Sequence, residues 1–144
     1  MVDIPTLDIE DYDPELNEEQ ETVEDKSGGA LTYAIVGAGQ GGGRIAKAFY
    51  DMGYTKMIAV NTARSDLNGL DIPEEQKFLV DEHGEQGAGK DQAKAEAAIE
   101  KKEQEVFNKF REVFGSNVDR ILICLGVSGG SGGGTVNTLI KVAK

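Results

Sequence analysis

The chain has 144 residues, 39% of them hydrophobic, with a formal net charge of −11 and a single cysteine. This length suits one domain with one core, and no apolar run is long enough to span a bilayer. One cysteine excludes an internal disulfide, and the N-terminus lacks the basic and apolar pattern of a signal peptide. We therefore expect a cytoplasmic protein.

The negative charge is concentrated at the N-terminus. Residues 1–26 hold eleven acids and one base, a net −10, which leaves 15 acids and 14 bases, a net −1, for residues 27–144. Because like charges repel, we predict an acidic disordered tail over residues 1–29, followed by a folded domain over residues 30–144. The tail either docks onto a protein partner or is a solvated extension. The nearly neutral body gives no indication of direct nucleic-acid binding.

Short β-branched or apolar runs alternate with helical spacing along the rest of the chain. Strands are predicted at residues 31–36, 57–60, 77–80 and 120–125. Helices are predicted at residues 44–52, 90–114 and 135–142. Strands that alternate with helices form a parallel sheet covered by helices, so the expected fold class is α/β.

Glycines gather in three loops at the carboxyl ends of the predicted strands. Residues 37–43 hold five glycines, residues 84–89 three and residues 126–134 six, which is 14 of the 19 in the chain. Glycine weakens regular structure, so such clustering indicates close approach of the backbone to a ligand. Helix N-termini present unpaired backbone N–H groups that favour phosphate. Three such loops at one sheet edge predict a polyphosphate ligand.

Two general motifs compete for these loops. Gly37, Gly39 and Gly42 fit the G-x-G-x-x-G fingerprint of an NAD(P)- or FAD-binding Rossmann domain in an oxidoreductase. That motif expects an acid near the end of the second strand, where Asn61 stands. Residues 84–91 nearly match a P-loop, but Asp91 replaces the hydroxyl residue that contacts Mg²⁺. The dinucleotide alternative stays open, as does a nucleotide-free interaction module.

A more specific resemblance comes from four segments in order. Residues 128–134, Ser-Gly-Gly-Ser-Gly-Gly-Gly, resemble the tubulin/FtsZ signature [SAG]-G-G-T-G-[ST]-G. Residues 58–62 are Ile-Ala-Val-Asn-Thr, as in that family's second strand, and residues 86–89 resemble its G-x-G-A-G segment. The loop at residues 37–43 resembles the family's glycine-rich opening loop. The chain from about residue 31 onward thus resembles the nucleotide-binding domain of tubulin/FtsZ proteins.

The resemblance implies a Rossmann-like three-layer fold with a parallel sheet, incomplete at its C-terminus. It also implies GTP or GDP as ligand, with Mg²⁺, and self-association into head-to-tail filaments of a cytoskeletal GTPase for cell division or for DNA or phage positioning. The location would be bacterial cytoplasm, or host cytoplasm for a phage protein. In this family a neighbouring subunit completes the hydrolytic site with acidic residues from a later loop, so this chain alone is expected to hydrolyse GTP poorly.

Carried over by position, the resemblance assigns phosphate-binding residues and no catalytic or metal-ligating ones. They are Gly39, Gln40, Gly41, Gly42, Arg44, Thr62, Ala88, Gly89, Lys90, Ser128, Gly129, Gly130, Ser131 and Gly132. Arg44 and Lys90 either contact a phosphate or face solvent. Ala63 stands where the family has an aspartate that positions metal, and Gly43 and Arg44 stand where it has the asparagine that faces guanine.

Overall fold

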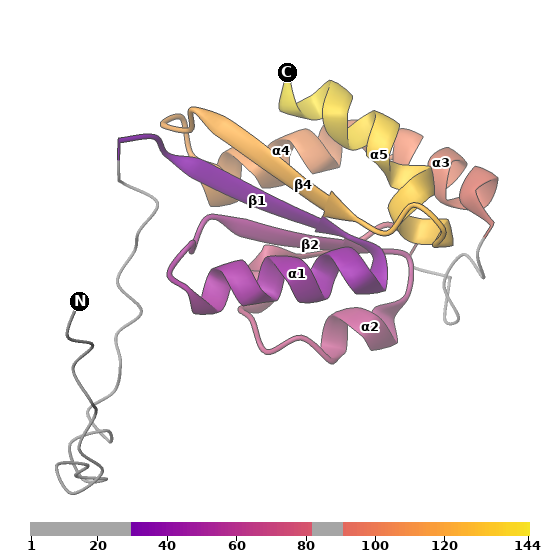
Figure 1. The fold of residues 1–144 in the computed structure, drawn as a ribbon. Helices are drawn as coiled ribbons and strands as arrows, with labels where there is room; N and C mark the ends of the chain where they lie inside the picture. The colour runs from indigo at the N-terminus through magenta and orange to yellow at the C-terminus, as the bar shows by residue number, and fades with distance from the viewer. Residues whose placement is uncertain (1–29, 82–90) are drawn as a thin grey trace, which may run out of the picture.

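Four parallel strands form the sheet of the computed structural model, which describes residues 30–81 and 91–144 (Figure 1). The predicted acidic tail at residues 1–29 and the predicted site residues Ala88, Gly89 and Lys90 lie outside the described residues. The strands are β1 (Tyr33–Ala38), β2 (Met57–Asn61), β3 (Lys77–Leu79) and β4 (Arg120–Leu125).

The strand order is β3-β2-β1-β4, and every pair is parallel. The chain builds outward from β1 through β2 to β3 and then returns to the other side of β1 for β4. The order therefore reverses between β1 and β4, and in such sheets the ligand crevice lies beyond the carboxyl ends of the strands at this point. Ala38 pairs with Leu125 there, at the last position of both strands.

Helices cover both faces of the sheet, so the predicted three-layer α/β fold is confirmed. In Figure 1, α1 (Gly39–Asp51) and α2 (Arg64–Asn68) lie on one face. The other face carries α3 (Gln92–Glu100), α4 (Glu103–Phe114) and α5 (Gly130–Ala143). A short 3-10 turn at Glu74–Gln76 precedes β3. No helix among the described residues has the length and apolar character needed to cross a bilayer.

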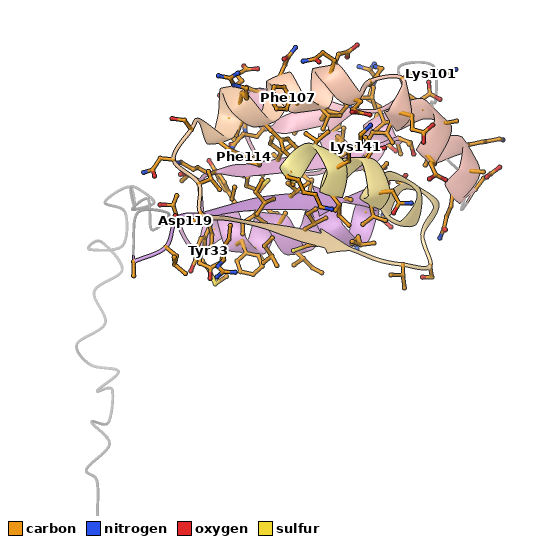
Figure 2. The ribbon with its side chains drawn as sticks, turned by 90° about the horizontal axis from the view of Figure 1, so that it is seen from above. Tyr33, Lys101, Phe107, Phe114, Asp119 and Lys141 are labelled. Carbon is orange, nitrogen blue, oxygen red and sulfur yellow. The ribbon has the colours of Figure 1, made fainter. Side chains whose placement is uncertain are left out.

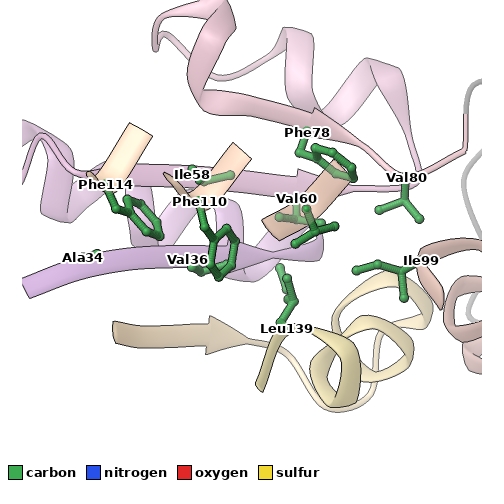
Figure 3. Close-up of a cluster of buried hydrophobic side chains, with 12 residues drawn as sticks. Ala34, Val36, Ile58, Val60, Phe78, Val80, Ile99, Phe110, Phe114 and Leu139 are labelled. Atoms are coloured by element: carbon green, nitrogen blue, oxygen red, sulfur yellow. The ribbon is translucent and has the colours of Figure 1, made fainter. Parts of the chain in front are cut away.

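Two buried clusters hold the layers together because alternate residues of a strand face opposite sides of the sheet. Val36 and Val60 face α4 and α5, where they pack with Phe110 and Leu139 (Figure 3). The second cluster lies beneath α1 and α2. It comprises Ile35, Ala46, Met57, Ala59, Leu67 and Ile72.

The other end of the sheet is closed by a contact between the residue before β1 and the loop before β4. The backbone N–H of Thr32 donates to the carboxylate of Asp119 over 2.7 Å. Figure 2 shows Asp119 near Tyr33, at the end of the sheet away from the starts of α1 and α5. This contact fixes the N-terminal ends of β1 and β4 and leaves the carboxyl ends for the glycine loops.

The glycine segments are less loop-like than the sequence predicts. We expected helices to begin at Arg44 and Thr135, but α1 begins at Gly39 and α5 at Gly130. The first strand runs to Ala38, two residues beyond the prediction. The low helix propensity of glycine is overridden here because close packing against neighbouring backbone requires a residue without a side chain.

The long helix predicted over residues 90–114 is two helices. The backbone N–H of Lys102 bonds to the Ile99 carbonyl, three residues back, and the helix restarts at Glu103. Both Ile99 and Val106 are nevertheless buried in the same cluster. The short α2 was not predicted, because five residues with one buried apolar side chain, Leu67, carry no periodic signal.

Candidate functional site

Two helix N-termini meet at the point where the strand order reverses. α1 follows β1 directly from Ala38, and α5 begins one short turn after β4, from Gly129. Neither helix has a side-chain cap. The N–H groups of a first helical turn have no partner within the helix, so they are donors that suit an anion.

The two N-termini are in direct contact. Gly39 has φ +75°, and a Cβ at this position would lie 2.9 Å from the backbone nitrogen of Gly132. A Cβ at Gly132 would in turn lie 2.9 Å from the Gly126 carbonyl oxygen and 3.1 Å from that of Ala38. Such distances exclude side chains, so glycine is required on both sides of the contact. The first and third predicted loops are thus brought together.

The remaining glycines of α1 divide by face. Gly42 is buried, and a Cβ there would collide with the carbonyl of Cys124 in β4. Gly41 is exposed, and a Cβ there would meet nothing within 4 Å. Gly42 therefore lets α1 lie close to the sheet, whereas packing gives no reason for glycine at position 41. Open space above a bare backbone fits a site that a ligand approaches.

The predicted residues Thr62 and Ser131 lie together beside the N-termini of α1 and α5, a place that we call the mouth of the site. Thr62 follows β2 and Ser131 lies in the first turn of α5, and their hydroxyl oxygens are 2.5 Å apart. Thr135 donates its hydroxyl to the Ser131 carbonyl over 2.6 Å and so supports the same turn of α5. Two hydroxyls from separate elements thus converge beside the start of α1.

Asp66, which was not predicted, contacts side chains from the start of α1 and the end of β2. Its carboxylate accepts from the side-chain amide of Asn61 over 3.2 Å and from that of Gln40 over 3.5 Å. Asn61 also accepts from the backbone N–H of Ala63 over 3.0 Å, which fixes the turn into α2. Sequence reasoning missed Asp66 because it lies in the unpredicted α2. Its only signal is a carboxylate five residues after Asn61.

Gln92 ties the start of α3 to the third glycine loop. Its side-chain amide donates to the Val127 carbonyl over 2.9 Å. Gly133 and Gly134 face this part of α3, and a Cβ at Gly134 would lie 2.6 Å from the Cβ of Ala95. α3 and α5 are therefore closely packed where they begin.

Two predicted residues lie at the edge of the site. Arg44 is exposed on α1, one turn beyond Gln40, and Ser128 is exposed in the turn that leads into α5.

Cys124 is half-buried in β4, and burial raises the pKa of its thiol. A thiol with a raised pKa stays protonated near neutral pH, as is typical of a cysteine that packs as a small hydrophobic side chain.

The chain's similarity to known proteins shows its family. The model of the tubulin/FtsZ family GTPase domain matches residues 32–144. The chain belongs to the tubulin/FtsZ family. The tubulin-like protein CetZ1 of Haloferax volcanii is 30% identical over 124 residues, covering 79% of this chain and 31% of the relative. CetZ5 of the same organism is 33% identical over 115 residues, covering 73% and 29%.

Solved structures of this tubulin/FtsZ family share the fold. A GDP-bound CetZ1 monomer from Haloferax volcanii has a TM-score of 0.68 and 31% identity, covering 76% of this chain and 36% of that one. A GTPγS-form protofilament of TubZ from Bacillus thuringiensis serovar israelensis has a TM-score of 0.60 and 29% identity, covering 84% and 34%. The chain therefore spans about a third of the length of the proteins it matches.

The dinucleotide alternative is not favoured. Besides the family match, the side chain at the end of β2 is the neutral Asn61, which is 2% exposed and engaged with Ala63 and Asp66. A ribose-binding acid is needed at this place in an NAD site, and no such acid stands at the strand's end.

Proposed function

We propose that this chain binds the phosphates of a guanine nucleotide at the paired N-termini of α1 and α5. The contact between Gly39 and Gly132 carries the proposal, because it places two uncapped helix N-termini side by side. Each N-terminus stabilises an anion by about 0.3–1 kcal/mol at an exposed site and by up to about 2 kcal/mol when partly buried. Two together suit a ligand with more than one phosphate.

The predicted residues of α1 and α5 would each contact a different part of the ligand. Gly39, Gln40 and Gly41 would offer backbone N–H groups from α1, and Gly129, Gly130 and Gly132 would offer them from α5. The hydroxyls of Thr62 and Ser131, 2.5 Å apart, would turn from each other to phosphate oxygens. Guanine is the proposed base because a CetZ1 relative is described as bound to GDP and a TubZ relative as in a GTPγS form.

Magnesium would accompany a triphosphate here. Among the described residues no group of three or more His, Cys, Asp or Glu side chains could hold a metal ion by itself. Mg²⁺ does not need such a cage, since it binds through one or two carboxylates, several waters and phosphate oxygens. When bound, it would neutralise charge on the phosphates, while the chain's own residues hold and orient the nucleotide.

Competition binding tests the proposal. Unlabelled GTP should displace a fluorescent guanine nucleotide from the chain, whereas NAD at the same concentration should not. Displacement by NAD as effective as by GTP would favour a dinucleotide site instead. If calorimetry detected no nucleotide binding at all, the chain would be an interaction module that retains the fold.

We also propose that the complete protein self-associates head to tail in the cytoplasm as a cytoskeletal GTPase. The support is family membership together with the protofilaments described for CetZ2 and TubZ relatives. Hydrolysis would then require groups from a neighbouring subunit, so the isolated chain should bind GTP but turn it over slowly. Phosphate release that is rapid and independent of chain concentration would argue against this division of roles.

A further inference from the structure

We infer that Asp66 binds the Mg²⁺ of a nucleoside triphosphate held by α1 and α5, an inference that rests on the proposed function. The position that carries the family's metal-positioning aspartate holds Ala63 in this chain, at the N-cap of α2. Asp66 stands one turn further along α2, and its carboxylate faces the amides of Gln40 and Asn61.

The partners of Asp66 leave its charge unbalanced. It is half-buried, and its hydrogen-bond donors are two neutral amides at 3.2 and 3.5 Å. Among the residues that the structure describes, no lysine or arginine forms an ion pair with it. A carboxylate that is partly withdrawn from water is stabilised by a cation or a metal. The amides orient this carboxylate but do not neutralise it.

The uncompensated charge of Asp66 matters because of where this residue lies. Gln40 is the second residue of α1, so a carboxylate that contacts its side chain lies beside the proposed phosphate site. A carboxylate and a phosphate held close together repel each other. A divalent cation, when bound at this site, would offset this repulsion.

The chemistry of the site selects magnesium. Zinc sites in proteins are built mainly from His and Cys side chains, and calcium takes six to eight oxygens; one carboxylate and two hydroxyls supply neither set. Mg²⁺ accepts one protein carboxylate, phosphate oxygens and several waters. Asp66 together with the phosphates therefore suffices, and Thr62 on the adjoining turn adds a hydroxyl at the same mouth.

Nucleotide affinity measured with and without Mg²⁺ tests the inference. A fluorescent GTPγS analogue would be titrated into the chain in Mg²⁺ and in EDTA. The wild-type chain should bind more tightly in Mg²⁺, and Asp66→Asn should lower this enhancement about tenfold. In EDTA the same variant should bind more tightly than wild type, because a repelling charge is gone. A purely structural role would weaken binding in both solutions.

Two further variants serve as controls. Asp71→Asn removes an exposed carboxylate on the connection from α2 to β3 and should leave the Mg²⁺ enhancement unchanged. Asp66→Glu keeps the charge and should retain part of the enhancement, which keeps the test informative if Asp66→Asn unfolds. Equal enhancement in wild type and Asp66→Asn would overturn the inference and leave the proposed function intact. Wild-type protein that binds no nucleotide would overturn both.

Discussion

At the scale of single residues, adjacent glycines in α1 have opposite reasons to be glycine. The Cα of Gly42 lies against the Cys124 carbonyl, so a methyl group there must displace backbone. Gly41 has open space around the position of a Cβ. The sheet therefore explains one glycine, and the proposed ligand explains the other.

This contrast predicts opposite effects on stability. Gly42→Ala should destabilise the fold by about 1–3 kcal/mol, since α1 must move away from β4. Gly41→Ala should be neutral or stabilise it by up to about 1 kcal/mol, because alanine favours helix. Urea denaturation of both variants measures the difference. Gly41→Ala should at the same time bind a fluorescent guanine nucleotide more weakly than wild type.

For Gly41→Ala, the informative result is unchanged or higher stability together with weaker nucleotide binding. A stable variant with lost binding places the ligand over the first turn of α1. Stable Gly41→Ala with wild-type affinity would move the phosphates away from this residue. Gly42→Ala as stable as wild type would contradict the close approach of α1 to β4.

At the scale of elements, α3 and α5 meet through two neighbouring glycines with different tolerance. A Cβ at Gly134 would collide with the backbone carbonyl of Gln92 and lie 2.6 Å from the Cβ of Ala95. A Cβ at Gly133 would meet the side-chain amide of Gln92, a flexible group. An added methyl group would therefore meet fixed backbone at Gly134 but a movable side chain at Gly133.

We predict that Gly134→Ala costs about 1–3 kcal/mol because the helices must separate. Gly133→Ala is the matched control and should cost about 1 kcal/mol or less, the value of the displaced hydrogen bond from Gln92 to Val127. The midpoint of thermal or urea unfolding for each variant gives the comparison. Equal losses in the two variants would show that the packing of α3 on α5 does not discriminate between these positions.

The elements also show how far the sequence determines the site. The apolar runs at residues 57–60, 77–80 and 120–125 predict three strands of the sheet to within one residue, because β-branched and other apolar residues favour strands. The helix starts were wrong by five residues at both α1 and α5. Glycine signals a loop in isolation, whereas here Gly42 and Gly132 lie in helices that come close to the backbone of Cys124 and Gly126.

The same limit explains the residues around the mouth. Thr62 and Ser131 were predicted from motif positions, but their contact depends on the strand order, which places β1 between β2 and β4. Asp66 had no motif to mark it, since its importance comes from Gln40, 26 residues earlier in the chain. Long-range contacts of this kind are set by topology rather than by local spacing.

At the scale of the whole molecule, the two edges of the sheet differ in protection. β3 has three residues and carries Lys77 at its start, and short charged edge strands resist pairing. β4 has six residues, of which only Arg120 is charged, and Leu122 is 41% exposed. No strand among the described residues pairs with the outer side of β4. β4 is therefore the less protected edge, where pairing between copies is expected.

Leu122→Lys should therefore reduce association of the isolated chain. A charge on the edge strand opposes strand pairing between copies, and a tenfold weaker association corresponds to about 1.4 kcal/mol. Met52→Lys is the control, since Met52 is 53% exposed at the end of α1 and the change in charge is the same. Sedimentation velocity over a range of concentrations should show less dimer for Leu122→Lys alone. Equal reduction in both variants would contradict a specific role of the β4 edge. Net charge alone predicts the opposite sign, because a lysine added to a chain of net charge −11 weakens the overall repulsion between copies.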